Sequence, residues 1–140
     1  MKKVYCLTPV YDDWESFEVL LMHIEKLQEK YSKKYTFSIV VINDGSTDEK
    51  SINSSKINIC TLNLKINIGH QRAIATGLQF IYKEVDQKDY VIVMDSDGED
   101  KPEDMMLLLE KAEKEQNKKI IFAQRKKRQE SVMFKLGYIV

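Results

Sequence analysis

Two aspartates, Asp95 and Asp97, directly follow a run of five apolar residues, 90–94. Such a run is typical of a short strand buried on both faces. Side chains two residues apart in extended backbone point to the same side, so we expect the two carboxylates to lie together. Crowded carboxylates repel one another unless a cation or a hydrogen-bond donor compensates them. A hard divalent ion, Mg²⁺ or Mn²⁺, that also bridges to a substrate diphosphate meets this need.

The same short pattern is also found in solvated acidic turns between a strand and a helix. For an isolated Asp-x-Asp motif, that interpretation is the commoner one. Gly98 permits a sharp bend after the two aspartates, and Glu99 and Asp100 extend the acidic segment. The choice between a metal site and a turn therefore depends on what else the fold brings to the same place.

Strand-like and helix-like segments alternate along the chain. Strands are predicted over 3–8, 35–42, 56–64, 90–94 and 119–123, and helices over 14–30, 67–84 and 103–115. Pro9 is expected to stop the first strand, and Asp12 or Asp13 to cap the first helix. Ser46 or Thr47 is expected to begin a short helix. The alternation, without hairpin signals, predicts an α/β fold with a mainly parallel sheet between helical layers.

Polar clusters follow three of these strands and open one helix. They occupy residues 9–12, 43–45, 67–70 and 95–97. In open parallel sheets, ligands bind beyond the carboxyl ends of the strands, and all of these clusters are predicted to lie there. Four such clusters at one edge are far less expected by chance than one alone, which favours a binding site over a simple turn.

The composition narrows the class of protein. At 140 residues, with 43% hydrophobic and 31% charged residues, the chain is predicted to be one soluble globular domain. Its net charge of zero argues against general nucleic-acid binding. Cys6 and Cys60 lie in apolar runs and do not form a disulfide framework. Neither a secretory signal nor a membrane-spanning run is visible, so we expect a cytoplasmic location, with peripheral association at the inner face of the membrane left open.

Taken together, residues 8–11, 41–48, 67–73 and 95–103 resemble, in order and spacing, the motifs of the family 2 glycosyltransferases. They look most like the polyprenyl-phosphate (dolichol-phosphate mannose synthase-like) branch. The resemblance implies a three-layer α/β/α fold of the GT-A, nucleotide-diphospho-sugar transferase type, here incomplete. It implies metal-dependent transfer of a sugar from a nucleotide-diphosphate sugar to an acceptor, either polyprenyl phosphate or a saccharide.

The resemblance also implies a division of the chain. Residues 1–128 would form the nucleotide-sugar-binding domain, and 129–140 would begin a truncated acceptor-side segment. We therefore expect the chain to carry mainly the donor-binding half. A lipid phosphate acceptor is already anionic and needs no strong base. No residue is assigned as a catalytic base, and homodimer formation is left open.

On the nucleoside side, the resemblance assigns five residues. Pro9 and Tyr11 would line the nucleobase pocket, where the tyrosine ring can stack. Asp44 would accept a hydrogen bond from the base. Asn67 and Gly69 would lie close to the nucleotide, because a glycine lets the backbone approach it.

On the phosphate side, the resemblance assigns Asp95 to the ribose and Asp97 to the metal. Glu99 stands where relatives often carry glutamine and would be a further metal ligand. Arg125 would pair with a donor or acceptor phosphate through its guanidinium group. Each role has a plainer alternative, such as a solvated face for the basic run at Arg125. His70 is interpreted as a helix-start or loop polar residue with little catalytic weight.

Three other classes of protein compete with this interpretation. A haloacid dehalogenase-type phosphohydrolase also places D-x-D-G after an apolar strand, with the first aspartate as nucleophile. That motif, however, usually follows the first strand. A non-catalytic nucleotide-sugar-binding module would bind the donor without turnover. A dinucleotide-binding oxidoreductase is disfavoured because no G-x-G-x-x-G follows the first strand.

Overall fold

The computed structural model describes residues 1–124; the predictions made for Arg125 and for the boundary at residue 128 lie outside the described residues. The elements, in chain order, are β1 Lys2–Val10, α1 Trp14–Tyr31, β2 Tyr35–Asn43, β3 Asn58–Asn63, α2 His70–Ile81, β4 Tyr90–Val93, the 3-10 turn η1 Pro102–Asp104, and α3 Met105–Lys114.

Four of these elements form one parallel sheet with the strand order β3-β2-β1-β4. Cys6 of β1 pairs with Ile39 of β2 on one side and with Ile92 of β4 on the other. Because the strands are all parallel, their carboxyl ends share one edge of the sheet. The sequence-based prediction of a mainly parallel sheet is confirmed.

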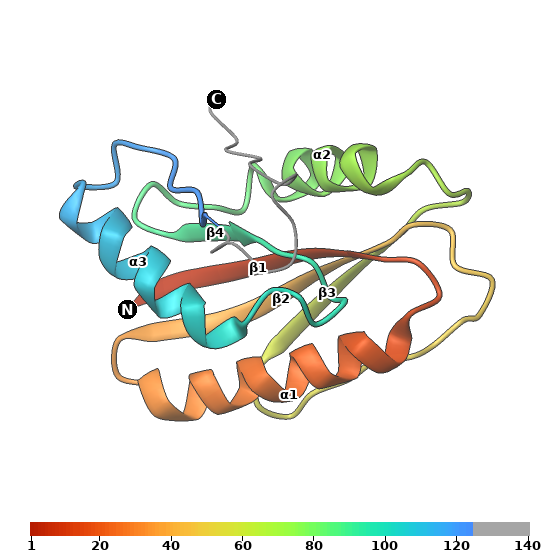
Figure 1. Cartoon of the computed structure of the whole chain (residues 1–140), viewed down its shortest axis with the longest axis horizontal. Helices are drawn as coiled ribbons and strands as arrows, with labels where there is room; N and C mark the ends of the chain where they lie inside the picture. Colours follow the sequence, from red (N-terminus) through yellow and green to blue (C-terminus); the bar gives the residue numbers. More distant parts are fainter. Residues whose placement is uncertain (125–140) are drawn as a thin grey trace, which may run out of the picture. The chain divides into compact units, whose positions relative to one another are not determined.

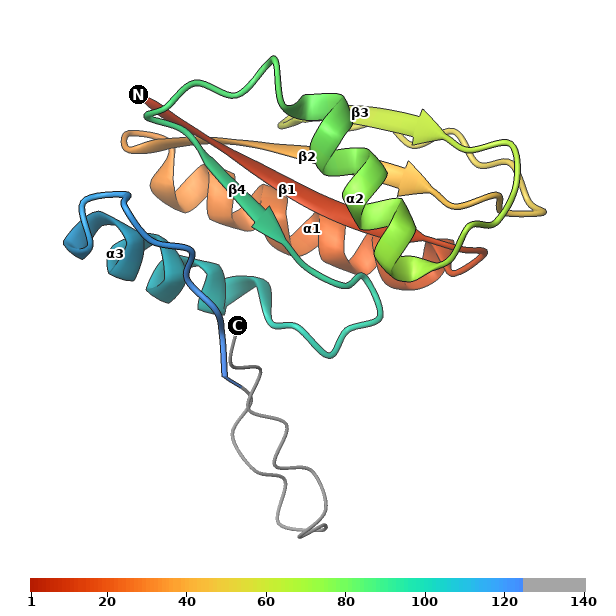
Figure 2. The same ribbon diagram turned by 90° about the horizontal axis from the view of Figure 1, so that it is seen from above.

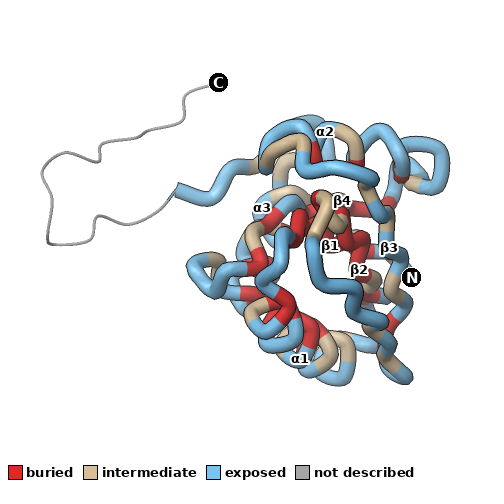
Figure 3. The backbone as a smooth tube through the Cα atoms, turned by 90° about the vertical axis from the view of Figure 1, so that its right-hand side faces the viewer, coloured by how far each residue is buried: buried red, intermediate tan, exposed pale blue. Residues whose placement is uncertain are grey.

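Helices α1 and α2 cover opposite faces of this sheet, as Figures 1 and 2 show. On the α2 face, Leu7, Val40 and Ile42 form a buried cluster with Ala73 of the helix. Gly77 permits the close approach, since a Cβ there would lie 2.5 Å from Ile42 Cδ1. Buried residues gather along the strands and the inward sides of both helices (Figure 3). The predicted α/β/α layering is therefore confirmed.

The first strand does not stop at Pro9, contrary to prediction; it continues to Val10. Successive residues of a strand direct their polar groups to alternate sides. Leu7 bonds towards β4, and Val10 bonds towards the β2 side through Asp44. Pro9 therefore faces the β4 side, and β4 has already ended at Val93. The missing N–H of proline costs no ladder hydrogen bond at this position.

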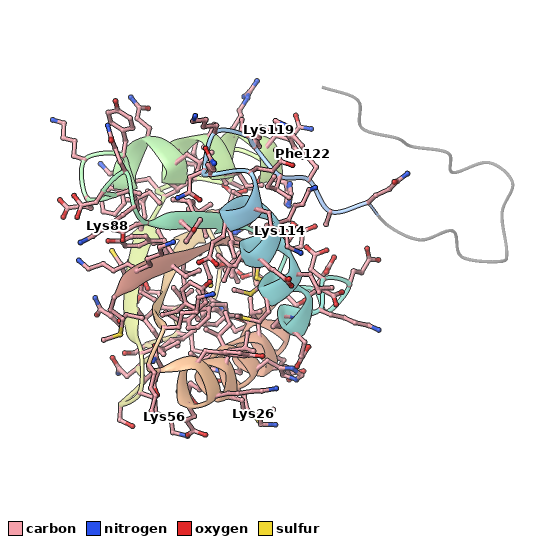
Figure 4. All side chains as sticks on the ribbon, turned by 90° about the vertical axis from the view of Figure 1, so that its left-hand side faces the viewer. Lys26, Lys56, Lys88, Lys114, Lys119 and Phe122 are labelled. Atoms are coloured by element: carbon pink, nitrogen blue, oxygen red, sulfur yellow. The ribbon has the colours of Figure 1, made fainter. Side chains whose placement is uncertain are left out.

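No helix begins at Ser46 or Thr47, where a short one was predicted. Ser46 and Thr47 bond instead to Asp12, and residues 48–56 run along α1 and bond to it at four positions. The pairs are Trp14 Nε1 to the Asp48 carbonyl at 3.2 Å, Glu18 to Lys50 at 2.6 Å, Glu25 to Ser54 at 2.5 Å and Glu29 to Lys56 at 2.8 Å. Lys56 is labelled beside α1 in Figure 4. Tertiary contacts with α1 thus replace the local hydrogen bonds of a helix.

β4 is less buried than predicted. Tyr90 and Ile92 are buried, but the side chain of Val93 is 42% exposed. In the described part of the chain, β4 is an edge strand and one of its sides carries no neighbour. The apolar run alone could not distinguish an edge strand from a central one.

Within the described residues, one compact unit covers residues 1–105 and a second begins at residue 106. In the second unit, α3 carries the ion pairs Lys114–Glu110 and Lys111–Glu115, each one helical turn apart. The strand predicted over 119–123 is not formed, and Ile120 is 82% exposed. An apolar β-branched run becomes a strand only when another strand pairs with it. No helix within residues 1–124 has both the length and the hydrophobicity needed to cross a bilayer.

Candidate functional site

Asp44 joins the end of β2 to the segment that opens α2. Its Oδ1 accepts the N–H of Ile68 at 2.8 Å, and its Oδ2 accepts the N–H of Gly69 at 3.1 Å. The Asn67 amide in turn donates to the Asp44 carbonyl at 3.1 Å. Asp44 is only 3% exposed, so these charge-assisted bonds lie out of water, where they are strongest. The aspartate therefore holds two of the predicted polar clusters together.

Gly45 shows how closely these two segments approach. Its φ is +71°, and a Cβ at this position would lie 2.4 Å from both Asn67 N and Ile66 C. Any other residue would collide with backbone atoms and would also be strained by the positive φ. The turn after β2 thus requires glycine for two separate reasons.

Asp12 joins the end of β1 to the same turn. Its Oδ1 accepts the N–H of Thr47 at 2.7 Å, the Thr47 hydroxyl at 3.0 Å and the N–H of Asp48 at 3.3 Å. Its own N–H donates to Ser46 Oγ at 2.9 Å. Desolvation opposes ionisation of the Asp12 carboxyl, but the bonds from Asp48 and Thr47 outweigh it and lower its pKa. Asp12 therefore links the loop after β1 to the turn after β2. Asp13 caps α1 by accepting the N–H of Ser16.

Asp95 lies at the junction of β4 and α2. Its Oδ1 is 2.5 Å from Nε2 of His70, the first residue of α2. Its N–H donates to Asp100 Oδ2 at 2.9 Å, which closes the acidic loop. The neighbouring Ser96 hydroxyl donates to the Pro9 carbonyl at 3.4 Å. His70 carried little catalytic weight in the interpretation of the sequence, although its place after Asn67 and Gly69, at the first turn of a helix, was the available signal.

Asp97 and Glu99, which follow Asp95 in the acidic loop, are both exposed to solvent. The Oδ1 of Asp97 accepts the N–H of Glu99 at 3.0 Å, as in a tight acidic turn. Within residues 1–124, no three His, Cys, Asp or Glu side chains converge as a ready-made metal site. Mg²⁺ usually takes one or two carboxylates and completes its shell with water and substrate phosphates. The exposed oxygens of this pair fit that donor set.

Two cavities adjoin the edge of the sheet. One, of about 330 Å³, lies between α1 and the acidic loop, and its lining includes Val19, Leu20 and Asp95. His23 and Glu103 also line it, 2.9 Å apart. The N–H of Glu103 itself, and then His23, lower the pKa of the Glu103 carboxyl. The second cavity, of about 350 Å³, is lined by residues 12–15 and 48–50.

The predicted site residues of the first unit thus lie at one edge of the sheet. Hydrogen bonds at this edge involve Pro9, Asp44, Asn67, Gly69 and Asp95. Tyr11, 52% exposed, follows β1 at this edge, and Asp97 and Glu99 follow β4. The roles assigned to these residues stay predictions, as does that of Arg125. Asp12 and His70 are the residues whose structural tasks sequence reasoning underrated.

Comparison with known proteins decides the family. The model of the family described as "Glycosyl transferase family 2" matches residues 5–138. The chain belongs to this family. Its parallel sheet with flanking helices is consistent with the GT-A type of fold. The resemblance drawn from the sequence motifs is confirmed.

A curated relative is the undecaprenyl-phosphate 4-deoxy-4-formamido-L-arabinose transferase of Salmonella choleraesuis (strain SC-B67). It is 29% identical over 119 residues, which cover 81% of this chain and 34% of the relative. The chain thus spans about a third of the length of this relative. The name of this relative describes a polyprenyl-phosphate sugar transferase, which agrees with the branch that the motifs resemble.

Proposed function

We propose that this chain binds a nucleotide-diphosphate sugar at the carboxyl edge of its sheet, as the donor part of a glycosyltransferase. Membership of the family supports the class of reaction. The observation that carries the proposal is the linkage of four loops, far apart in sequence, by the carboxylates of Asp12, Asp44 and Asp95. An edge built this way has little freedom to lose when a ligand binds, and pre-organisation of this kind favours affinity.

The nucleoside would bind between the ends of β1 and β2. The half-exposed ring of Tyr11 offers a stacking surface beside Pro9. Asn67 and Gly69 would bring backbone close to the nucleotide. The Asp44 carboxylate already accepts the N–H groups of Ile68 and Gly69. The same carboxylate would therefore both fix the loop before α2 and accept the predicted hydrogen bond from the base.

The diphosphate would bind beside the acidic loop. Asp97, with Glu99, would hold Mg²⁺ or Mn²⁺, and this ion would supply Lewis-acid stabilisation of the departing nucleoside diphosphate. Asp95 would accept a hydrogen bond from a ribose hydroxyl. Arg125 would pair with phosphate.

The acceptor would be a polyprenyl phosphate, the class named for the relative. Its phosphate oxygen would attack the anomeric carbon, the bond from that carbon to the nucleoside diphosphate would break, and both electrons of that bond would leave with the nucleotide. The attacking phosphate is already anionic, so no group on this chain has to remove a proton. A lipid acceptor would bring the protein to the cytoplasmic face of a membrane. Self-association as a homodimer is a separate proposal, which size-exclusion chromatography would test.

Calorimetry with UDP-, GDP- and dTDP-sugars, each with and without Mn²⁺, tests donor binding. One nucleotide class should bind, and binding should tighten with Mn²⁺. Asp97→Asn should abolish the metal-dependent part of binding, whereas Asp86→Asn, in the loop at the opposite edge of the sheet, should not. Equal binding by the parent and Asp97→Asn, with Mn²⁺ present, would show that the metal assignment is wrong.

A transfer assay separates the enzyme from a non-catalytic binding module. Radiolabel should move from the bound sugar nucleotide to polyprenyl phosphate supplied in vesicles. Donor binding without transfer would favour the binding module. The match to glycosyl transferase family 2 argues against the haloacid dehalogenase-type hydrolase, whose motif also belongs on the first strand and not on β4.

A further inference from the structure

The pair formed by His70 and Asp95 joins the first residue of α2 to the segment that follows β4. His70 begins α2, and Asp95 is the second residue after β4. Nε2 of the imidazole lies 2.5 Å from Oδ1 of the carboxylate, a short charge-assisted contact. The His70 side chain is 56% exposed and that of Asp95 31% exposed, so the pair lies at the mouth of the proposed site and not in the core.

Both partners have fixed backbones. The N–H of Gly69, directly before His70, is held by Asp44 Oδ2, and the Gly69 carbonyl accepts the N–H of Ala73 at 2.9 Å. The N–H of Asp95 is held by Asp100 Oδ2. With both main chains anchored, the remaining freedom of Asp95 is rotation of its side chain, and the imidazole removes it.

The chemistry of the pair fixes the position of the proton. An ionised carboxylate can only accept hydrogen bonds, so Nε2 of His70 carries the hydrogen. Oδ1 of Asp95 is then engaged by the imidazole, and Oδ2 is the oxygen that can turn to a ligand.

We propose that His70 is a positioning residue: it holds the Asp95 carboxylate in one rotamer and thereby directs its second oxygen to a hydroxyl of the bound donor. This inference rests on the proposed function for the donor, but the contact on which it depends can be measured without any donor. The imidazole itself does not touch the reacting atoms.

Three variants separate this role from general stability. His70→Ala removes the donor, and His70→Gln places an amide N–H at similar reach. Gln71→Ala is the matched control, since Gln71 is exposed in the same turn of α2. With the nucleotide-diphosphate sugar selected by the panel and Mn²⁺, His70→Ala should weaken binding about 10-fold, and His70→Gln and Gln71→Ala less than about 3-fold. Melting temperatures should stay close to that of the parent.

Imidazole ¹⁵N NMR of the full chain tests the pair without ligand. The parent should show His70 as the Nε2–H tautomer with a slowly exchanging proton, and Asp95→Ala should abolish that signal. If the parent binds no donor, the proposed function fails, while the tautomer still decides whether the pair exists. The inference is overturned if His70→Ala binds the donor as tightly as the parent does, or if His70→Gln loses as much donor affinity as His70→Ala. It is also overturned if the Nε2–H signal of His70 is unchanged in Asp95→Ala.

Discussion

Substitution of Gly45 by alanine tests the closeness of the two loops that build the nucleoside side of the site. An alanine Cβ would lie 2.4 Å from two backbone atoms, Asn67 N and Ile66 C. Carbon atoms pack at about 3.5 Å or more, so the loops must separate by about 1 Å. Separation of this size breaks the amide bonds that Asp44 accepts, each of which contributes about 1.5–3 kcal/mol as a bond to a charged group.

A matched control removes the contribution of backbone strain. Gly98 has a φ of +84°, and a Cβ there would meet no atom within 4 Å. Gly98→Ala should therefore cost only the positive-φ strain, about 1–2 kcal/mol. Gly45→Ala adds the loss of two hydrogen bonds to the same strain and should cost about 4–8 kcal/mol.

Urea unfolding, followed by fluorescence, measures both costs. The chain has a single tryptophan, and Trp14 is 5% exposed with its Nε1 bonded to the loop that follows Gly45. The reasoning is refuted if the two alanine variants differ by less than about 1 kcal/mol, because the close approach of the loops would then cost nothing.

Three further predictions concern the interior and the first loop. Thr8 is fully buried, and its hydroxyl is the one buried side-chain polar atom in the described residues without a partner; Thr8→Val should raise the free energy of unfolding by about 1 kcal/mol in urea, and a loss of stability would contradict this. The lowered pKa of Asp12 means that its contribution to stability is present above the ordinary aspartate value of about 3.9 and is lost as pH falls through the lower folded value. Unfolding of Asp12→Asn at several pH values should therefore depend less on pH in that acid range than unfolding of the parent. Burial raises the pKa of the Cys6 thiol, whereas Cys60 is exposed. A thiol reagent should therefore label one cysteine per native chain and two after unfolding. Rapid labelling of both cysteines in the native chain would contradict the described core.

Periodicity and turn chemistry were sufficient to predict most of the fold. The apolar spacing of α1 and the β-branched run of β2 placed those elements within one or two residues, because each buries a complete face or both faces. The same reasoning failed at Pro9, where the effect of proline depends on which side of the strand lacks a neighbour. It also failed at 119–123, because pairing with another strand is not a local property.

The candidate site was predictable in its location but not in its internal bonds. Strand ends followed by polar clusters identified the edge of the sheet, since parallel strands end together. The sequence could not show that both oxygens of Asp44 hold backbone amides, or that Asp12 binds the turn after β2, because these contacts span 24 to 36 residues. The pairing of His70 with Asp95 depends in the same way on the placement of α2 beside β4.

The central claim is that the carboxyl edge of the sheet is the donor site. Titration of ¹⁵N-labelled protein with a nucleotide-diphosphate sugar and Mg²⁺, followed by amide chemical shifts, tests it most directly. The account predicts the largest shifts in residues 9–12, 44–46, 67–70 and 95–99. Shifts confined to 32–35 and 86–89, the loops at the opposite edge, would contradict it.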